Sequence, residues 1–270
     1  MIIAQDKIII NVVYEFHHIR DLSKAEQPYE NDMILSLGSN SSRYSTLYEY
    51  TNNRPTVLLQ QNKIQEANSS SSDKVVRGGY GLLVNNGGVL TRDEINKNLI
   101  NKEYTMYSFI GNRTYSLSGS IPILKWKILK EKKEIGGYVC QKALADFAGR
   151  TYEAWFTTQL PFQNGPWKLG GLPGLILEAK DIKNEVQFVF KEISRNTDPD
   201  ETTKTLQEYP QFAIPVEEKQ LQKLEATFIK NPLGFVKAIF PDSNIAIINI
   251  QDSDNRSIPV IKDFNPVELN

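Results

Sequence analysis

Apolar and polar residues alternate along short segments of this chain, and turn-forming residues separate these segments. Between Lys7 and His18, one side of an extended chain is entirely apolar, with Ile8, Ile10, Val12, Tyr14 and Phe16. Such alternation is typical of a strand with one buried face. Similar segments cover residues 33–37 and 42–50 and recur between residues 80 and 194, with Gly, Pro and Asn between them. The pattern predicts an antiparallel sheet built largely from hairpins.

Helical periodicity is confined to two regions. Residues 55–67 suit a short helix, and residues 216–239 predict a longer helical region that Asn231 and Pro232 interrupt. A polar tract near residues 68–73 has no apolar side chains with which to pack a core, so we interpret it as a solvated loop. We therefore predict one β-rich α+β domain over residues 1–270. The domain contains a large, twisted antiparallel sheet, and one form of this prediction is an open half-barrel. The helices pack on the sheet.

Charge and cysteine content exclude several classes of protein. The chain has 31 Lys and Arg residues against 32 Asp and Glu residues, so it lacks the basic surface that nucleic acid requires. Cys140 is the only cysteine, which excludes an internal disulfide and a zinc site built from cysteines. Apolar runs stay shorter than the 18–20 residues of a membrane-spanning helix. The opening residues "MIIAQDK" are compatible with the tail of a signal segment.

Residues 165–181, "GPWKLGGLPGLILEAKD", are the most unusual stretch of the sequence. A phosphate-binding loop would lead into a helix, whereas Gly174 leads into the strand-like residues Leu175 and Ile176. Pro173 and Gly174 suit the two central positions of a type II turn. Gly170 and Gly171 remove two side chains, which permits a sharp bend or the close approach of a backbone or ligand. The stretch therefore predicts a turn that feeds a buried strand.

The block from Ile135 to Asp181 resembles the defining block of the GLPGLI family, whose name residues 171–176 spell. The resemblance includes "GYVC" at 137–140, "AWFT" at 154–157 and "GP" at 165–166, and residues 265–269, "NPVEL", are similar to the usual end of the family. It implies an exported protein of a Gram-negative bacterium, made with a cleavable signal peptide and located in the periplasm or at the outer membrane. It implies no activity, cofactor or catalytic residue. A looser similarity, to periplasmic carriers of outer-membrane lipoproteins, implies a curved antiparallel sheet closed by helices.

Residues able to carry catalysis are few. The two histidines, His17 and His18, are adjacent in a strand and point to opposite faces, so we expect no shared metal ion and no serine-hydrolase triad. We interpret Cys140 as a small buried hydrophobe. A pair of carboxylates can hydrolyse glycosides, and Glu153, Glu178 and Asp181 flank the motif. Bases such as Arg150 and Lys180 are their expected partners.

The aromatic residues near the motif give the stronger functional signal. They cluster around turn-forming prolines, where they could line one end of an apolar cavity. The candidate ligand-binding residues are Trp155, Phe156, Phe162, Trp167, Leu169 and Leu172.

We therefore expect an exported, non-enzymatic binding protein of the cell envelope that holds an apolar, lipid-like or peptide ligand and needs no cofactor. Two alternatives stay open. An envelope accessory or structural protein would expose an apolar patch or a sheet edge to a protein partner, and a hydrolase would gather carboxyl groups with raised pKa values in a cleft.

Overall fold

A computed structural model describes residues 6–51, 79–85, 88–89, 92–111, 113–195, 206, 213–241, 244–249 and 261–269. The predicted helix over residues 55–67 and the predicted polar loop near residues 68–73 lie outside these ranges. Among the described residues, no helix is long and apolar enough to cross a membrane.

The architecture is dominated by one open sheet of 12 strands, in the order β14-β8-β7-β6-β3-β2-β1-β13-β12-β11-β10-β9. Its pairings are antiparallel except for β14 with β8. The strands are β1 (Ile10–His18), β2 (Tyr29–Leu37), β3 (Ser41–Thr46), β6 (Arg92–Asn98), β7 (Glu103–Ile110), β8 (Arg113–Ser120), β9 (Lys127–Ile135), β10 (Tyr138–Phe147), β11 (Arg150–Thr157), β12 (Leu175–Asp181), β13 (Val186–Arg195) and β14 (Ile214–Pro215). The prediction of a β-rich fold with a large open antiparallel sheet is confirmed.

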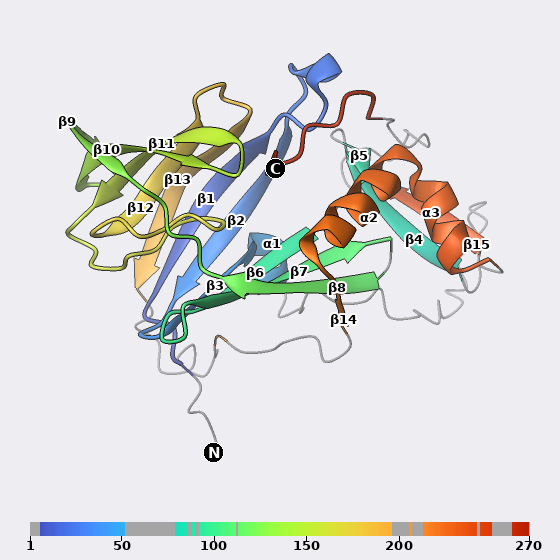
Figure 1. The fold of residues 1–270 in the computed structure, drawn as a ribbon, viewed down its shortest axis with the longest axis horizontal. Coiled ribbons are helices and arrows are strands. Elements are labelled where there is room, and N and C mark those ends of the chain that lie inside the picture. Colours follow the sequence, from blue (N-terminus) through green and yellow to red (C-terminus); the bar gives the residue numbers. More distant parts are fainter. Residues whose placement is uncertain are drawn as a thin grey trace, which may run out of the picture.

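The sheet is strongly twisted. In Figure 1, β6, β7 and β8 run across the direction of β1 and β2, so the two ends of the sheet face different ways. Strand β1 lies near its middle and pairs with β2 on one side and β13 on the other. Its predicted apolar face is buried, with Val12 and Tyr14 fully enclosed. The core therefore follows the inner face of the sheet from β7 to β12.

Helices and a small second sheet cover one end of the large sheet. Helix α2 (Glu218–Lys230) and helix α3 (Pro232–Ile239) follow one another, and the side chain of Asn231 accepts a hydrogen bond from Gly234 N at the start of α3. Figure 1 shows α2 lying across β7 and β8, close to the small sheet. That sheet has the order β15-β4-β5, formed by β15 (Asn244–Asn249), β4 (Gly79–Asn85) and β5 (Gly88–Val89). The predicted helical region and its interruption at Asn231 and Pro232 are confirmed.

Two local expectations are corrected by the structure. The strand expected over residues 42–50 ends at Thr46, and helix α1 (Leu47–Thr51) follows. Strand β6 pairs only with Ser41 to Tyr44, so the later residues lack a ladder on that side. Strand β6 itself was not expected, because its sequence "RDEINKN" has a single apolar residue. A 3-10 helix (Leu22–Lys24) follows β1.

Candidate functional site

A pocket lies at the end of the large sheet that α2 covers. Its volume is about 260 Å³. The floor comes from β6, β7 and β8, whose register places Asp93 opposite Ser108 and Met106 opposite Leu117. These four side chains share the inner face of the sheet and line the pocket. The floor is therefore half polar and half apolar.

One face of α2 forms a second wall. The residues that line the pocket follow helical spacing and are Glu218, Leu221, Gln222, Glu225 and Ala226. Helical spacing places Glu225 on the same side of α2 as Leu221 and Phe228, which are buried against the sheet. A carboxyl group on the apolar side of a helix is the sequence signal that could have indicated this site.

The third wall combines the motif loop, residues 158–174 between β11 and β12, with the C-terminal segment, residues 261–269. In Figure 1 the C-terminal segment runs between the large sheet and the helices. Trp167 Nε1 donates a hydrogen bond to Glu268 Oε1 at 2.9 Å, and Lys168 Nζ donates one to Glu268 Oε2 at 2.9 Å. Pro266 and Val267 complete this wall. Residues 100 and 101 positions apart thus meet at one side of the pocket.

Arg150 holds the C-terminal segment against the sheet. Its guanidinium, almost fully buried, pairs with Asp181 at 2.8 Å and with Glu185 at 2.7 Å. It also donates to Asn265 Oδ1 at 2.6 Å and to the carbonyl of Pro266 at 2.7 Å. A buried cation with this many oxygen partners has a fixed orientation. Arg150 therefore positions the segment that carries Glu268.

Lys97 anchors the motif loop to strand β6. This buried side chain of β6 donates hydrogen bonds to Asn164 Oδ1 and to the carbonyl of Leu169, both at 2.9 Å. Burial lowers the pKa of Lys97 to about 7. Trp167, between these two contacts, has a left-handed backbone with φ of 55°. The lysine therefore helps to fix the loop that presents Trp167 and Lys168 to the pocket.

The carboxyl groups of the pocket have unequal environments. Burial raises the pKa of Asp93, while a hydrogen bond of 2.5 Å from the Ser108 hydroxyl and the charges of Arg20 and Lys168 oppose the rise. Burial, followed by the charge of Asp93, raises the pKa of Glu225 to about 8. Burial tends to lower the pKa of Lys168, but the Glu268 carboxylate outweighs it, and the pKa is raised. The pocket thus contains one paired carboxylate, Glu268, and two carboxyl groups, Asp93 and Glu225, whose pKa values are raised by burial.

The candidate ligand-binding residues do not gather around the described pocket. Phe156, Leu169 and Leu172 are buried in the core, and Phe162 is partly buried against it. Trp155 lies away from the pocket, with the ammonium groups of Lys133 and Lys142 at 4.7 and 5.7 Å from its ring centre. Trp167 is the member of this set that lines the described pocket.

The motif turn differs from the predicted type II turn. Gly174 has φ of 159°, far from the value of about 80° that this turn needs. Gly174 N donates to the carbonyl of Leu172 at 2.7 Å, and Leu175 N donates to Leu160 instead of closing a turn. A Cβ on Gly174 would lie 2.1 Å from the carbonyl oxygen of Thr157. The glycine is needed for close backbone approach, and Leu175 and Ile176 then enter β12 fully buried, as expected.

The other candidate catalytic residues have structural roles. Burial would raise the pKa of Glu153, but hydrogen bonds from Lys142 and Trp155 lower it. Glu178 pairs with Lys133, and Asp181 pairs with Arg150. Burial raises the pKa of the Cys140 thiol to about 11, so it is a poor nucleophile.

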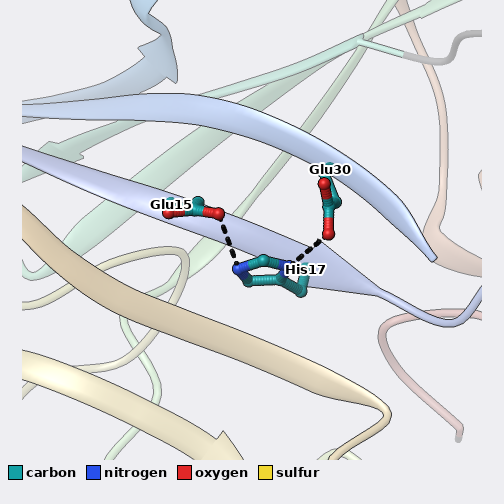
Figure 2. A group of neighbouring side chains, drawn as sticks. All are labelled: Glu15, His17 and Glu30. Carbon is teal, nitrogen blue, oxygen red and sulfur yellow. Dashed lines mark hydrogen bonds and ion pairs between the residues drawn. The ribbon is translucent and has the colours of Figure 1, made fainter.

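The histidines have different surroundings. His18 is buried, its Nε2 lies 2.8 Å from the carbonyl oxygen of Asn265, and burial holds its pKa well below the usual value. His17 belongs to the one group of three potential metal ligands found among the described residues, with Glu15 and Glu30. Figure 2 shows both carboxylates turned toward the His17 ring, at 3.1 Å from Nε2 and 3.0 Å from Nδ1. These two contacts account for the grouping of the three side chains.

A family model and two solved structures are similar to parts of this chain. Residues 101–212 match the family model described as "N-glycanase peptide, N-terminal domain". No curated protein matches the chain. Two solved structures of PNGF-II, in space groups P21 and C2, are similar at 15% and 14% identity, with TM-scores of 0.49 and 0.47. Each match covers 80% of this chain but only 33% or 32% of the PNGF-II chain, so the chain spans about a third of their length.

The expectation that the chain is not an enzyme is contradicted by the match to the N-glycanase domain model. The catalytic candidates from the sequence included Glu153, Glu178 and the two histidines, which contact oppositely charged groups or lie in the core. Asp93 and Glu225 were not among them, because only the pairing of β6 with β7 and the packing of α2 bring these two residues to one pocket.

Proposed function

We propose that this chain acts on N-glycosylated peptides and that the pocket between α2, the sheet and the C-terminal segment holds the glycan-bearing part of the substrate. The observation that carries the proposal is the presence of several carboxyl groups and Lys168 beside Trp167 in one concave site. Carboxylates accept hydrogen bonds from sugar hydroxyl groups, and an ammonium group donates to them. The match of residues 101–212 to an N-glycanase domain supports the same substrate class.

The size and polarity of the pocket favour a small polar group. Its volume of about 260 Å³ lies below the ~300–1,000 Å³ typical of pockets for drug-sized ligands. A single sugar ring with its hydroxyl groups fits this description better than a lipid chain does. The floor residues Met106 and Leu117 and the indole of Trp167 would contact the apolar faces of the ring. The proposal thus replaces the expected apolar ligand with a polar one, while export to the cell envelope and the GLPGLI resemblance stay predictions.

A variant that fills the pocket tests this proposal. Ala226 is exposed on α2 and lines the pocket, so Ala226→Trp should fill it without disturbing the core. We expect isothermal titration calorimetry to show that the wild-type protein binds a glycosylated asparagine peptide and that Ala226→Trp weakens this binding at least about tenfold, or 1.4 kcal/mol.

The neighbouring residue supplies a matched control. Thr227 is also exposed on α2 but does not line the pocket, so Thr227→Trp should bind the glycopeptide like the wild-type protein. Equal affinity for the same peptide without its glycan, or equal binding by Ala226→Trp and Thr227→Trp, would contradict the proposal.

A further inference from the structure

Two carboxyl groups of the pocket are not neutralised by a partner in the way Glu268 is. Glu268 is bound by Lys168 and Trp167, and Glu218 is exposed at the start of α2. Asp93, on β6, and Glu225, on α2, line the pocket from the floor and from the helix wall. Asp93 and Glu225 line the same pocket of about 260 Å³, and the charge of Asp93 raises the pKa of Glu225. Two such groups share a proton more readily than both ionise.

Their surroundings assign different roles. Asp93 Oδ1 accepts a hydrogen bond from Ser108 at 2.5 Å, and the cations of Arg20 and Lys168 act on it; each of these interactions stabilises its carboxylate form. Glu225 lies on the same face of α2 as Leu221, beside the apolar Met106 and Leu117 of the floor, and burial favours its protonated form. Two carboxyl groups whose environments stabilise different protonation states are the usual arrangement for a base and an acid in one site.

Resting on the proposed function, we infer that Asp93 and Glu225 form an acid–base pair that hydrolyses the linkage between the glycan and its asparagine. The Asp93 carboxylate takes a proton from water while the water oxygen forms a bond to the carbon attached to the linkage nitrogen. The bond between that carbon and the nitrogen breaks, and its electron pair goes to the nitrogen, which takes the proton of the Glu225 carboxylic acid. A proton then returns from Asp93 to Glu225 through solvent, which restores the starting state.

The dependence of the rate on pH follows from the groups that face this pair. Lys168 and Glu268 from the third wall, Arg20, Ser108 of β7 and Glu218 of α2 set the local charge. Burial raises the pKa of Glu225 to about 8, so the acid loses its proton and the rate should fall above that pH.

The test measures release and binding with the same substrate. A peptide with one glycosylated asparagine is incubated with the protein and analysed by mass spectrometry, while calorimetry gives its affinity. We expect the wild-type protein to release the glycan. Glu225→Gln and Asp93→Asn should each lower the rate at least about 100-fold, with affinity within about twofold of wild type, because general acid or base catalysis contributes about 10²–10⁴-fold. Glu217→Gln, at an exposed position next to α2 that does not line the pocket, should keep the wild-type rate.

Each outcome decides between the two proposals. Absence of glycopeptide binding by the wild-type protein would overturn the proposed function. Binding without release, or release by Glu225→Gln at the wild-type rate, would overturn the acid–base pair while leaving the binding site intact. Conversion of the asparagine to aspartate would place the attack at the side-chain amide carbon, and recovery of asparagine would place it at the sugar carbon. If the wild-type protein forms either product and both Glu225→Gln and Asp93→Asn fail to form it, the result supports the acid–base pair.

Discussion

At the scale of single residues, the motif loop is held by one buried lysine and one close backbone contact. Lys97 donates to Asn164 Oδ1 and to the carbonyl of Leu169, and Gly174 passes against the carbonyl of Thr157. The importance of the motif glycines was clear from the sequence. The role of Lys97 was not, because a lysine in a polar segment normally lies at the surface.

Replacing Lys97 tests the first contact. Lys97→Met retains much of the side chain but leaves the oxygen atoms of Asn164 and Leu169 without this donor. Because an unsatisfied buried acceptor costs about 1–3 kcal/mol, we expect the free energy of unfolding to fall by about 2 kcal/mol or more in urea. Lys130→Met, at an exposed position of β9, should change it by less than about 0.5 kcal/mol. Equal stability of the two variants would show that Lys97 does not anchor the loop.

Replacing Gly174 tests the second contact. A Cβ at this position would lie 2.1 Å from the Thr157 carbonyl oxygen, so Gly174→Ala requires a backbone shift. Gly171 has φ of 83° and no atom within 4 Å of an added Cβ, so Gly171→Ala should cost only the ~1–2 kcal/mol of a left-handed backbone. We expect thermal unfolding to show a clearly larger loss for Gly174→Ala. A larger loss for Gly171→Ala would contradict the close approach.

At the scale of elements, α2 combines a structural role with the candidate chemistry. Leu221 and Phe228 are buried against the sheet, and Glu225 lies between them along the same side. The helix and its end at Asn231 could be predicted, because helical spacing and the Asn-Pro pair are local signals. Strand β6 could not, because its polar residues find their partners only in the folded chain: Glu94 pairs with β3, Asp93 accepts a hydrogen bond from β7, and Lys97 binds the motif loop.

The protonation of Glu225 makes a prediction for stability. Its pKa in the folded chain is about 8 against an ordinary value of 4.5, so the folded state binds more protons between these pH values. The free energy of unfolding should therefore decrease as pH rises from about 5 to 8. Urea unfolding of Glu225→Gln should show a smaller decrease than wild type. Glu217→Gln, an exposed position at the start of the helix, should reproduce the wild-type slope, and identical slopes for all three proteins would contradict the shift.

At the scale of the whole molecule, the pocket is a product of sheet topology. Four distant parts of the chain supply charged residues to it, which are Asp93, Lys168, Glu225 and Glu268. The 12-stranded sheet and the C-terminal segment that Arg150 holds bring them together. The alternating pattern predicted the sheet and its inner face, because each strand carries that signal locally. The order of the strands depends on long-range pairing, so the sequence indicated Trp167 as a candidate but not the acids around it.

The central claim is that the pocket binds the glycan of an N-glycosylated peptide. The most direct measurement is a crystal structure of the protein grown with a short glycosylated asparagine peptide. We predict a sugar ring bounded by Trp167, Glu225 and the floor residues Met106 and Leu117. A glycopeptide bound elsewhere on the chain, with this pocket empty, would contradict the account.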